Sequence, residues 1–212
     1  EGPLVRFGLV RLSQSEHVLV VNMHHIISDA WSVGVLLREL AYFYSATQDG
    51  ADPSLEESSI QYVDFASWQR EQFESQSQKP VLDYWRSQLQ GPLPVLAFPT
   101  DHPRQAKQSF QGATQNFTVP AQVGERLKAL NTREGVTPFM TLLTAFQALL
   151  ALYTGREDIV VGTPIANRTR AELEGLIGFF ANTLVLRTRL DRLPDAPSFR
   201  DLLRHVREIT LS

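Results

Sequence analysis

The pattern of apolar and polar positions predicts an antiparallel hairpin in the first part of the chain. Residues 4–12 alternate in side-chain character, which is the period of a strand with two different faces. A turn-forming cluster at 13–16 separates them from a second β-rich run, His17 to Met23, which we expect to be largely buried. This second strand leads directly into the segment His24-His25-Ile26-Ile27-Ser28-Asp29-Ala30-Trp31-Ser32.

Three helices are predicted after this segment. Ser28 or Asp29 can cap the first, whose apolar residues recur with the helical period: Val33, Leu36, Leu37, Leu40, Phe43 and Tyr44. The second presents an aromatic face over 62–73, and Pro80 and Gly91 bracket the third. The stretch 92–103 has four prolines and no period, which favours a linker.

The second half of the chain mixes strands and helices. The pattern predicts strands at 115–119, 158–163 and 183–190, an aperiodic loop at 164–182, and helices at 121–133, between Thr137 and Gly155, and after the Ser198–Asp201 capping pair. The helix that starts at Pro138 is apolar around most of its circumference, so we expect burial on several sides. The mixed order predicts an α/β (mixed α+β) fold with two layers or two lobes.

Composition narrows the function classes. The chain has 20 Lys and Arg against 23 Asp and Glu, a net charge of −3, so it offers no broad footprint for nucleic acid or an anionic membrane. It contains no cysteine, which excludes disulfides, thiolate metal sites and a cysteine nucleophile, and fits a cytoplasmic protein. No apolar run approaches the roughly 20 residues of a membrane span. The chain opens in a strand pattern and stops in a helical one, so we expect it to be part of a longer protein.

The two adjacent histidines and the acid four residues later are the candidate chemistry. Because neighbouring side chains of a strand point to opposite faces, we expect one histidine to face a cavity and the other to support it. A neutral imidazole near pH 7 can take a proton from an attacking amine or hydroxyl. The alternative is that both histidines are satisfied packing residues and that Asp29 only caps a helix.

Other chemistries fit the residues less well. Metal ligation by His24, His25 and Asp29 is disfavoured because the two imidazoles are expected to point apart, so no metal site is predicted. A serine hydrolase is disfavoured because no G-x-S-x-G elbow is present, and no glycine-rich phosphate loop occurs either.

Five motifs in order resemble the condensation domains of nonribosomal peptide synthetases. The segment His24 to Ser32 is similar to their HHxxxDG signature. The other four are Tyr62-Val63-Asp64-Phe65-Ala66-Ser67-Trp68-Gln69-Arg70, Asp83-Tyr84-Trp85 ahead of Phe98-Pro99-Thr100-Asp101, Gly162 to Arg168, and Ile177 to Leu184. The resemblance runs the whole length of the chain.

The resemblance implies a chloramphenicol acetyltransferase-like two-lobe sandwich with a tunnel between the lobes. The fragment would cover parts of both lobes, about half of the domain. Residues 1–97 would be the C-terminal part of the first lobe with the histidine motif, 98–112 the inter-lobe linker, and 113–212 the first part of the second lobe. The isolated fragment is therefore expected to be inactive.

The resemblance also implies an acyltransferase that forms a peptide bond between a donor acyl or peptidyl thioester and an acceptor aminoacyl thioester. His25 would be the catalytic residue, as general base or as an anchor for the amine, with His24, Asp29, Ala30, Trp31 and Ser32 as supporting residues. Asp29 would be held by an arginine of an earlier motif, upstream of residue 1. Asn182 and Arg168 are candidate tunnel-lining residues.

The implied partners are an upstream donor and a downstream acceptor peptidyl carrier protein, with an adenylation domain in the same polypeptide. No cofactor would bind directly, because phosphopantetheine arrives on the carriers. Ala30 replaces the usual glycine of the signature. The alternatives are an epimerisation domain of the same superfamily and a catalytically inactive carrier-docking domain, which only Ala30 favours. A heterocyclising domain is disfavoured because its aspartate-based signature is absent.

Overall fold

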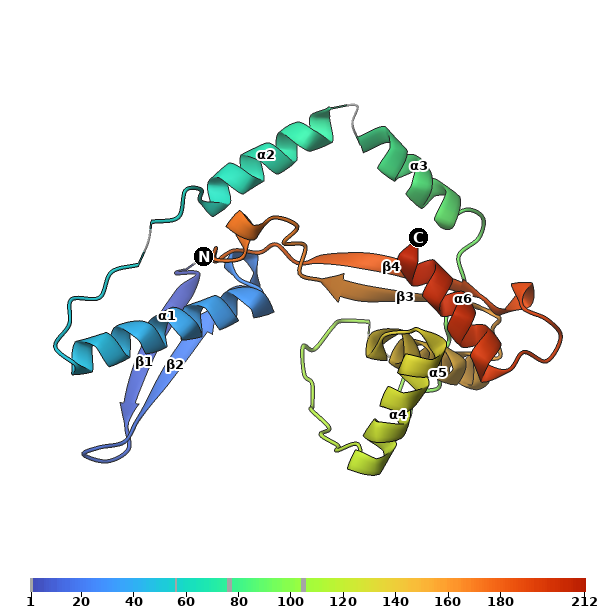
Figure 1. Cartoon of the computed structure of the whole chain (residues 1–212), viewed down its shortest axis with the longest axis horizontal. Helices are drawn as coiled ribbons and strands as arrows, with labels where there is room; N and C mark the ends of the chain where they lie inside the picture. The colour runs from blue at the N-terminus through green and yellow to red at the C-terminus, as the bar shows by residue number, and fades with distance from the viewer. Residues whose placement is uncertain (1, 56, 76–77, 104–105) are drawn as a thin grey trace. The chain divides into compact units, whose positions relative to one another are not determined.

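The computed structural model describes residues 2–55, 57–75, 78–103 and 106–212 (Figure 1). The chain divides into two compact units, Glu1–Asp83 with Pro164–Leu184 (unit 1) and Tyr84–Thr163 with Val185–Ser212 (unit 2). The predicted lobe boundaries, with a linker at 98–112, stay a prediction, and residues 104–105 of that linker lie outside the described residues. The compact units divide at other positions, because Pro164–Leu184 belongs with the first part of the chain.

The predicted hairpin is present in unit 1. Strand β1 (Val5–Arg11) pairs antiparallel with β2 (His17–Met23), in a register that runs from Val5 opposite Met23 to Arg11 opposite His17. The prediction that the second strand is largely buried is wrong, since Val18, Leu19 and Val20 are 43–49% exposed. An apolar run is buried only where another layer packs on it, and these side chains have no such cover among the described residues.

Helices α1 (Ala30–Gln48) and α2 (Tyr62–Glu74) follow the hairpin, and the core of unit 1 forms around α2. Four buried side chains build this core, with Ile60 and Tyr62 packed against them: Phe65, Leu173, Leu176 and Phe180. Three of the four come from 164–182, the segment predicted to be an aperiodic loop, which contains a short 3-10 helix at Ala171–Leu173. The core of unit 1 therefore joins α2 to a loop about 100 residues further along the chain.

The remaining helices and strands largely agree with their predicted positions. They are α3 (Lys79–Gln88), α4 (Ala121–Glu134), α5 (Pro138–Thr154), β3 (Asp158–Ile165), β4 (Asn182–Arg189) and α6 (Phe199–Leu211), and β3 and β4 form a second two-stranded sheet. Thr137 caps α5, Gly155 ends it in the left-handed conformation, and Ser198 forms a capping box with Asp201. The core of unit 2 contains Leu143, Leu186, Leu202 and Val206.

Two expectations for this half of the chain are wrong. Residues 115–119 form no strand, and Phe117 is 85% exposed. A strand needs a neighbour for its backbone hydrogen bonds, and among the described strands none pairs with this segment. Helix α5 is not buried on several sides: one face is covered, while the apolar side chains on its other positions are 44–83% exposed, namely Phe139, Leu142, Phe146, Leu149, Leu152 and Tyr153.

The covered face of α5 is partly polar. Thr141 donates to Asn131 (2.6 Å), and Thr188 donates to Gln147 (2.9 Å), all with buried side chains. Hydrogen bonds of this kind make the burial of such groups tolerable. In the described part of the chain no single helix is long and apolar enough to cross a membrane, although α4 and α5 pass that test together with a bend of 103° between them.

Candidate active site

The segment between β2 and α1 is a tight turn and not a continuation of the strand. The backbone N–H of His24 still donates to Leu4 (2.8 Å), after which His25–Ile27 forms a single 3-10 turn. The two histidines therefore have different places in this turn: His24 is its N-cap, and His25 is its first residue. The expectation that strand alternation separates them is wrong, because the strand ends before both residues.

The hydrogen bonds assign opposite tautomers to the two imidazoles. His25 Nδ1 lies 2.6 Å from the carbonyl oxygen of Ser28, and a carbonyl only accepts, so Nδ1 carries the proton and Nε2 keeps its lone pair. His24 Nδ1 instead accepts from the backbone N–H of Ile26 (3.0 Å), which caps the 3-10 turn and puts the proton of the neutral ring on Nε2. Of the two rings, His25 is the one whose Nε2 can accept a proton.

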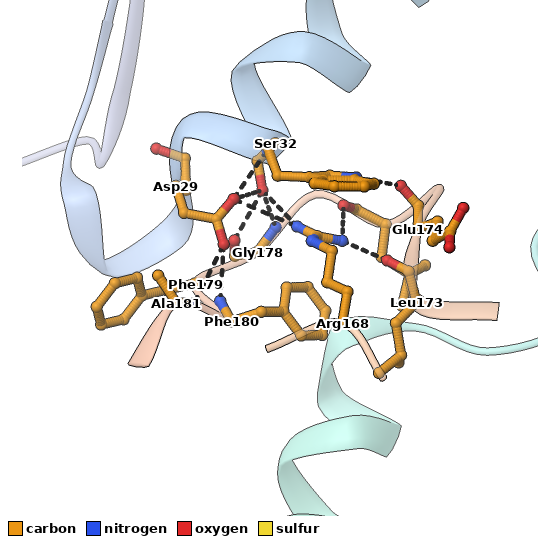
Figure 2. Close-up of polar contacts among 12 residues, drawn as sticks. Asp29, Ser32, Arg168, Leu173, Glu174, Gly178, Phe179, Phe180 and Ala181 are labelled. Atoms are coloured by element: carbon orange, nitrogen blue, oxygen red, sulfur yellow. Dashed lines mark hydrogen bonds and ion pairs between the residues drawn. The ribbon is translucent and has the colours of Figure 1, made fainter. Parts of the chain in front are cut away.

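Asp29 is the N-cap of α1, and its carboxylate is fully engaged (Figure 2). Oδ1 accepts from the backbone N–H and the hydroxyl of Ser32 (both 2.8 Å) and from Arg168 Nη2 (3.3 Å). Oδ2 accepts from the backbone N–H groups of Phe180 (3.1 Å) and Ala181 (3.2 Å). The residue is 4% exposed, so the carboxylate ties the start of α1 to a distant loop and has no free face for substrate.

The arginine that pairs with Asp29 is Arg168, 139 residues downstream. This corrects the expectation that Asp29 is held by an arginine upstream of residue 1. The Arg168 side chain is 1% exposed, its Nη1 donates to the carbonyls of Leu173 and Leu176, and its guanidinium lies 4.0 Å from the ring centroid of Phe180. Arg168 is therefore a buried structural cation.

The surroundings of Asp29 keep it ionised. Burial alone would raise the pKa of the Asp29 carboxyl, but hydrogen bonds from Ser32 and Phe180 and the charge of Arg168 outweigh this effect, and the pKa lies below its usual value. Asp29 therefore carries no proton to transfer near neutral pH. It acts as a fixed anion.

Ser32 and Trp31 attach the first turn of α1 to the same loop. The Ser32 hydroxyl is fully buried, accepts from Gly178 N–H (3.0 Å) and Arg168 Nη2 (2.9 Å), and lies 2.7 Å from the Gly178 carbonyl oxygen. The indole N–H of Trp31 donates to the carbonyl of Glu174 (2.8 Å). The structure thus brings four of the predicted site residues into one network: Asp29, Trp31, Ser32 and Arg168.

Ala30 and Asn182 lie outside this network. Ala30 is the first residue of α1 and lines a hollow of about 400 Å³ with Asp29, Trp31, Pro164, Ile165, Ala166 and Ala181. Asn182 is exposed, and its side chain accepts from the N–H of Thr183 (2.8 Å). The tunnel-lining role of Asn182 stays a prediction. Among the described residues, no group of three or more His, Asp or Glu is arranged to hold a metal ion.

The model of the condensation-domain family matches residues 1–212. The chain belongs to the condensation-domain family. One of the linear gramicidin synthase proteins of Brevibacillus parabrevis is 48% identical over 210 residues, which are 99% of this chain and 3% of that protein. The predicted family and the mixed α/β fold of the chloramphenicol acetyltransferase-like type are confirmed.

Two solved structures place this condensation-domain segment in a larger fold. SgcC5 of Streptomyces globisporus superimposes with a TM-score of 0.79 at 33% identity, over 99% of this chain and 46% of that one. The X-domain in a complex with OxyB from teicoplanin biosynthesis gives a TM-score of 0.86 at 28% identity, over 98% of this chain and 46% of that one. The chain spans about half the length of these solved structures.

Sequence reasoning missed the residues that join the loop at 178–181 to the histidine turn. Tyr62 donates its hydroxyl to the Phe179 carbonyl (3.0 Å), and the Phe179 ring packs edge-on against the His25 ring. Both residues lie in segments that the motifs had marked, but the motif pattern carried no sign that the two segments meet. A glycine between large apolar residues, Gly178, was the available signal of a close approach.

Gly178→Ala is expected to destabilise the condensation domain by about 1–3 kcal/mol, because overpacking a tight contact costs this much. A Cβ at Gly178 would overlap Cδ2 of the Tyr62 ring. Urea unfolding of the full-length protein measures the effect. Gly175→Ala is the matched control, since its Cβ would meet nothing within 4 Å. Equal stability of the two variants would contradict the assigned contact, and Gly178→Ala should cost much less in a Tyr62→Ala background than in the wild type.

Proposed function

We propose that this segment carries the catalytic histidine of a nonribosomal peptide synthetase condensation domain. The reaction would join a donor acyl or peptidyl thioester to the amine of an acceptor aminoacyl thioester, each on a carrier protein. The observation that carries the proposal is the tautomer of His25, because the Ser28 carbonyl at 2.6 Å holds the proton on Nδ1 and leaves Nε2 as the acceptor. Family membership and the similarity to a gramicidin synthase support it.

The proposed chemistry is aminolysis of a thioester. The acceptor amine attacks the thioester carbonyl carbon, so that a C–N bond forms while the C–S bond breaks, and the departing thiolate takes up a proton. His25 Nε2 either takes the proton that the amine loses or accepts a hydrogen bond that holds the amine in line with the carbonyl. His24 and Asp29 take no part in proton transfer in this scheme, because their acceptor atoms are engaged.

The proposed partners follow from this reaction. A donor carrier and an acceptor carrier bring the two thioesters on phosphopantetheine arms, so this chain itself would bind no cofactor. An adenylation domain in the same polypeptide would load the acceptor carrier. The small share of the relative that the chain covers, 3%, is consistent with a large multidomain protein.

The test is a mass measurement on the acceptor carrier. The full-length protein is mixed with a donor aminoacyl carrier and an acceptor aminoacyl carrier, and the acceptor is followed by mass spectrometry over time. We expect a mass gain equal to the donor acyl group. Loss of stereochemical purity at one carrier-bound residue, without a mass gain, would instead indicate an epimerisation domain.

A second candidate function is binding without catalysis. It is favoured by the likeness to an X-domain that was solved in a complex with OxyB, and by Ala30 at the position where the family signature has glycine. The same carriers distinguish the two functions. Retention of a carrier on the immobilised full-length protein, with no mass gain in the acceptor, would support a docking domain.

A further inference from the structure

Phe179 contacts the ring of His25 from the loop that Asp29 and Ser32 hold in place. The two ring centroids are 5.1 Å apart, and the ring planes meet at 69°, an edge-to-face arrangement. Such pairs have a preferred geometry, so the aromatic ring restricts the orientation of the imidazole. Phe179 lies in the labelled loop of Figure 2, beside the two residues whose N–H groups bind Asp29.

The Ser28 hydrogen bond alone does not define the orientation of the His25 ring. With Nδ1 bonded to the Ser28 carbonyl, the ring can still tilt through small changes in its χ1 and χ2 torsions, and such a tilt moves Nε2. A contact on the ring itself removes this freedom. Phe179 is the aromatic side chain that supplies it.

Three hydrogen bonds hold the backbone at Phe179 and at the residues on either side of it. The N–H of Gly178 donates to Ser32 (3.0 Å), the N–H of Phe180 donates to Asp29 (3.1 Å), and the carbonyl of Phe179 itself accepts from the Tyr62 hydroxyl (3.0 Å). The absence of a side chain at Gly178 lets the Tyr62 ring approach this closely. The position of the Phe179 ring is thus set by residues from α1, α2 and the loop together.

The two adjacent phenylalanines have different surroundings. Phe180 is 2% exposed and belongs to the core of unit 1, whereas Phe179 is 41% exposed and is not part of that core. Burial of the Phe179 side chain therefore contributes less to stability than that of Phe180.

We propose that Phe179 is a positioning residue that orients the His25 imidazole toward the reacting amine, and that Tyr62 fixes Phe179 through its carbonyl. The inference rests on the proposed function of His25. It assigns to the aromatic loop residue the role of aligning the proton acceptor. The cost of losing this alignment falls on the chemical step and not on binding of the carriers.

The test compares variants of the full-length protein in the acceptor mass assay. Phe179→Leu is expected to lower kcat by about 3–30-fold, because a small displacement of a catalytic group costs up to about 100-fold, and to leave the KM of both carriers within about twofold. Phe179→Tyr keeps the ring and is expected to restore kcat to within about twofold. Tyr62→Phe removes only the bond to the Phe179 carbonyl and is expected to lower kcat by about 2–5-fold.

Leu202→Ala is the control for a loss of stability alone. Leu202 is 6% exposed and packs in the core of unit 2, which includes none of the described residues that contact Phe179 or His25. Its replacement is expected to lower the melting temperature while leaving kcat unchanged, and Phe179→Leu is expected to do the reverse. A fall in kcat that follows the loss of melting temperature equally in both variants would overturn the positioning role.

Failure of this inference differs from failure of the proposed function. If the wild type forms product, His25→Ala does not, and Phe179→Leu keeps full kcat, the positioning role alone is overturned. If the wild type forms no product, or His25→Ala forms it at the normal rate, both are overturned. A kcat near the wild-type value in Phe179→Tyr, together with a lowered kcat in Phe179→Leu, supports the inference.

Discussion

His25→Ala in the full-length protein is expected to lower the rate of amide formation by about two to four orders of magnitude, the range that a general base contributes. His25 is the imidazole whose Nε2 keeps a lone pair, because its Nδ1 is engaged with the Ser28 carbonyl. The exposed side chain also loses its hydrogen bond to the Ser28 carbonyl, so we expect a modest fall in melting temperature, comparable with that of His24→Ala. The initial rate of mass gain on the acceptor carrier measures the effect.

His24→Ala is the matched control for this prediction. His24 accepts the Ile26 N–H, so its loss removes a cap, which typically costs about 0.5–2 kcal/mol of stability. We expect a lower melting temperature and a rate close to the wild-type rate. His25→Gln separates the two roles of His25, because an amide oxygen accepts a hydrogen bond but takes no proton at neutral pH. A near-normal rate in His25→Ala, or an equal loss in both alanine variants, would contradict the assignment.

Asp29→Asn is expected to lower the free energy of unfolding by about 3–5 kcal/mol, the usual cost of breaking a buried ion pair at one partner. Five donors surround the two carboxylate oxygens: the N–H and hydroxyl of Ser32, Arg168 Nη2, and the N–H groups of Phe180 and Ala181. An asparagine presents an NH₂ group in place of one oxygen, so donors would face donors. The charge of Arg168, whose side chain is 1% exposed, would also lose its partner.

Asp191→Asn is the matched control, because it makes the same chemical change in an exposed ion pair. Asp191 lies 2.7 Å from Arg189, with both side chains about a third exposed, and such pairs contribute little to stability. Urea unfolding of the full-length protein compares the two variants. The double variant Asp29→Asn with Arg168→Met should lose less than the sum of the single variants, because it removes both buried charges. If Asp29→Asn is as stable as Asp191→Asn, the buried carboxylate does not contribute the stability assigned to it.

Local patterns in the sequence predicted the helices and most of the strands of this chain. Caps and breakers act within a few residues of the position they mark, so Thr137, Gly155 and the Ser198–Asp201 box could be assigned before any packing was known. The same holds for the hairpin β1–β2, whose turn cluster and strand period lie within 20 residues. The five ordered motifs were also sufficient to predict the family.

Whether an apolar side chain is buried depends on which distant segment packs against it, and the local sequence pattern does not say which segment that is. Helix α5 and strand β2 are apolar enough to be buried, yet many of their side chains are exposed. The periodicity of a segment shows which of its positions are apolar, but it does not show whether another layer of the fold covers them. Residues 115–119 have a strand composition but no strand, because a strand exists only with a partner for its backbone.

Features of this chain that depend on neighbouring residues were predictable, and features that depend on contacts between distant segments were not. The first group contains most of the secondary elements, their caps, the family and the pair of histidines, because these are properties of neighbouring residues or of ordered motifs. The tertiary structure decided which arginine holds Asp29 and which aromatic ring faces His25. These contacts join α1 and its preceding turn to a loop more than 130 residues away, and a contact across that separation is specified by the packing of the whole unit and not by the pattern at either end.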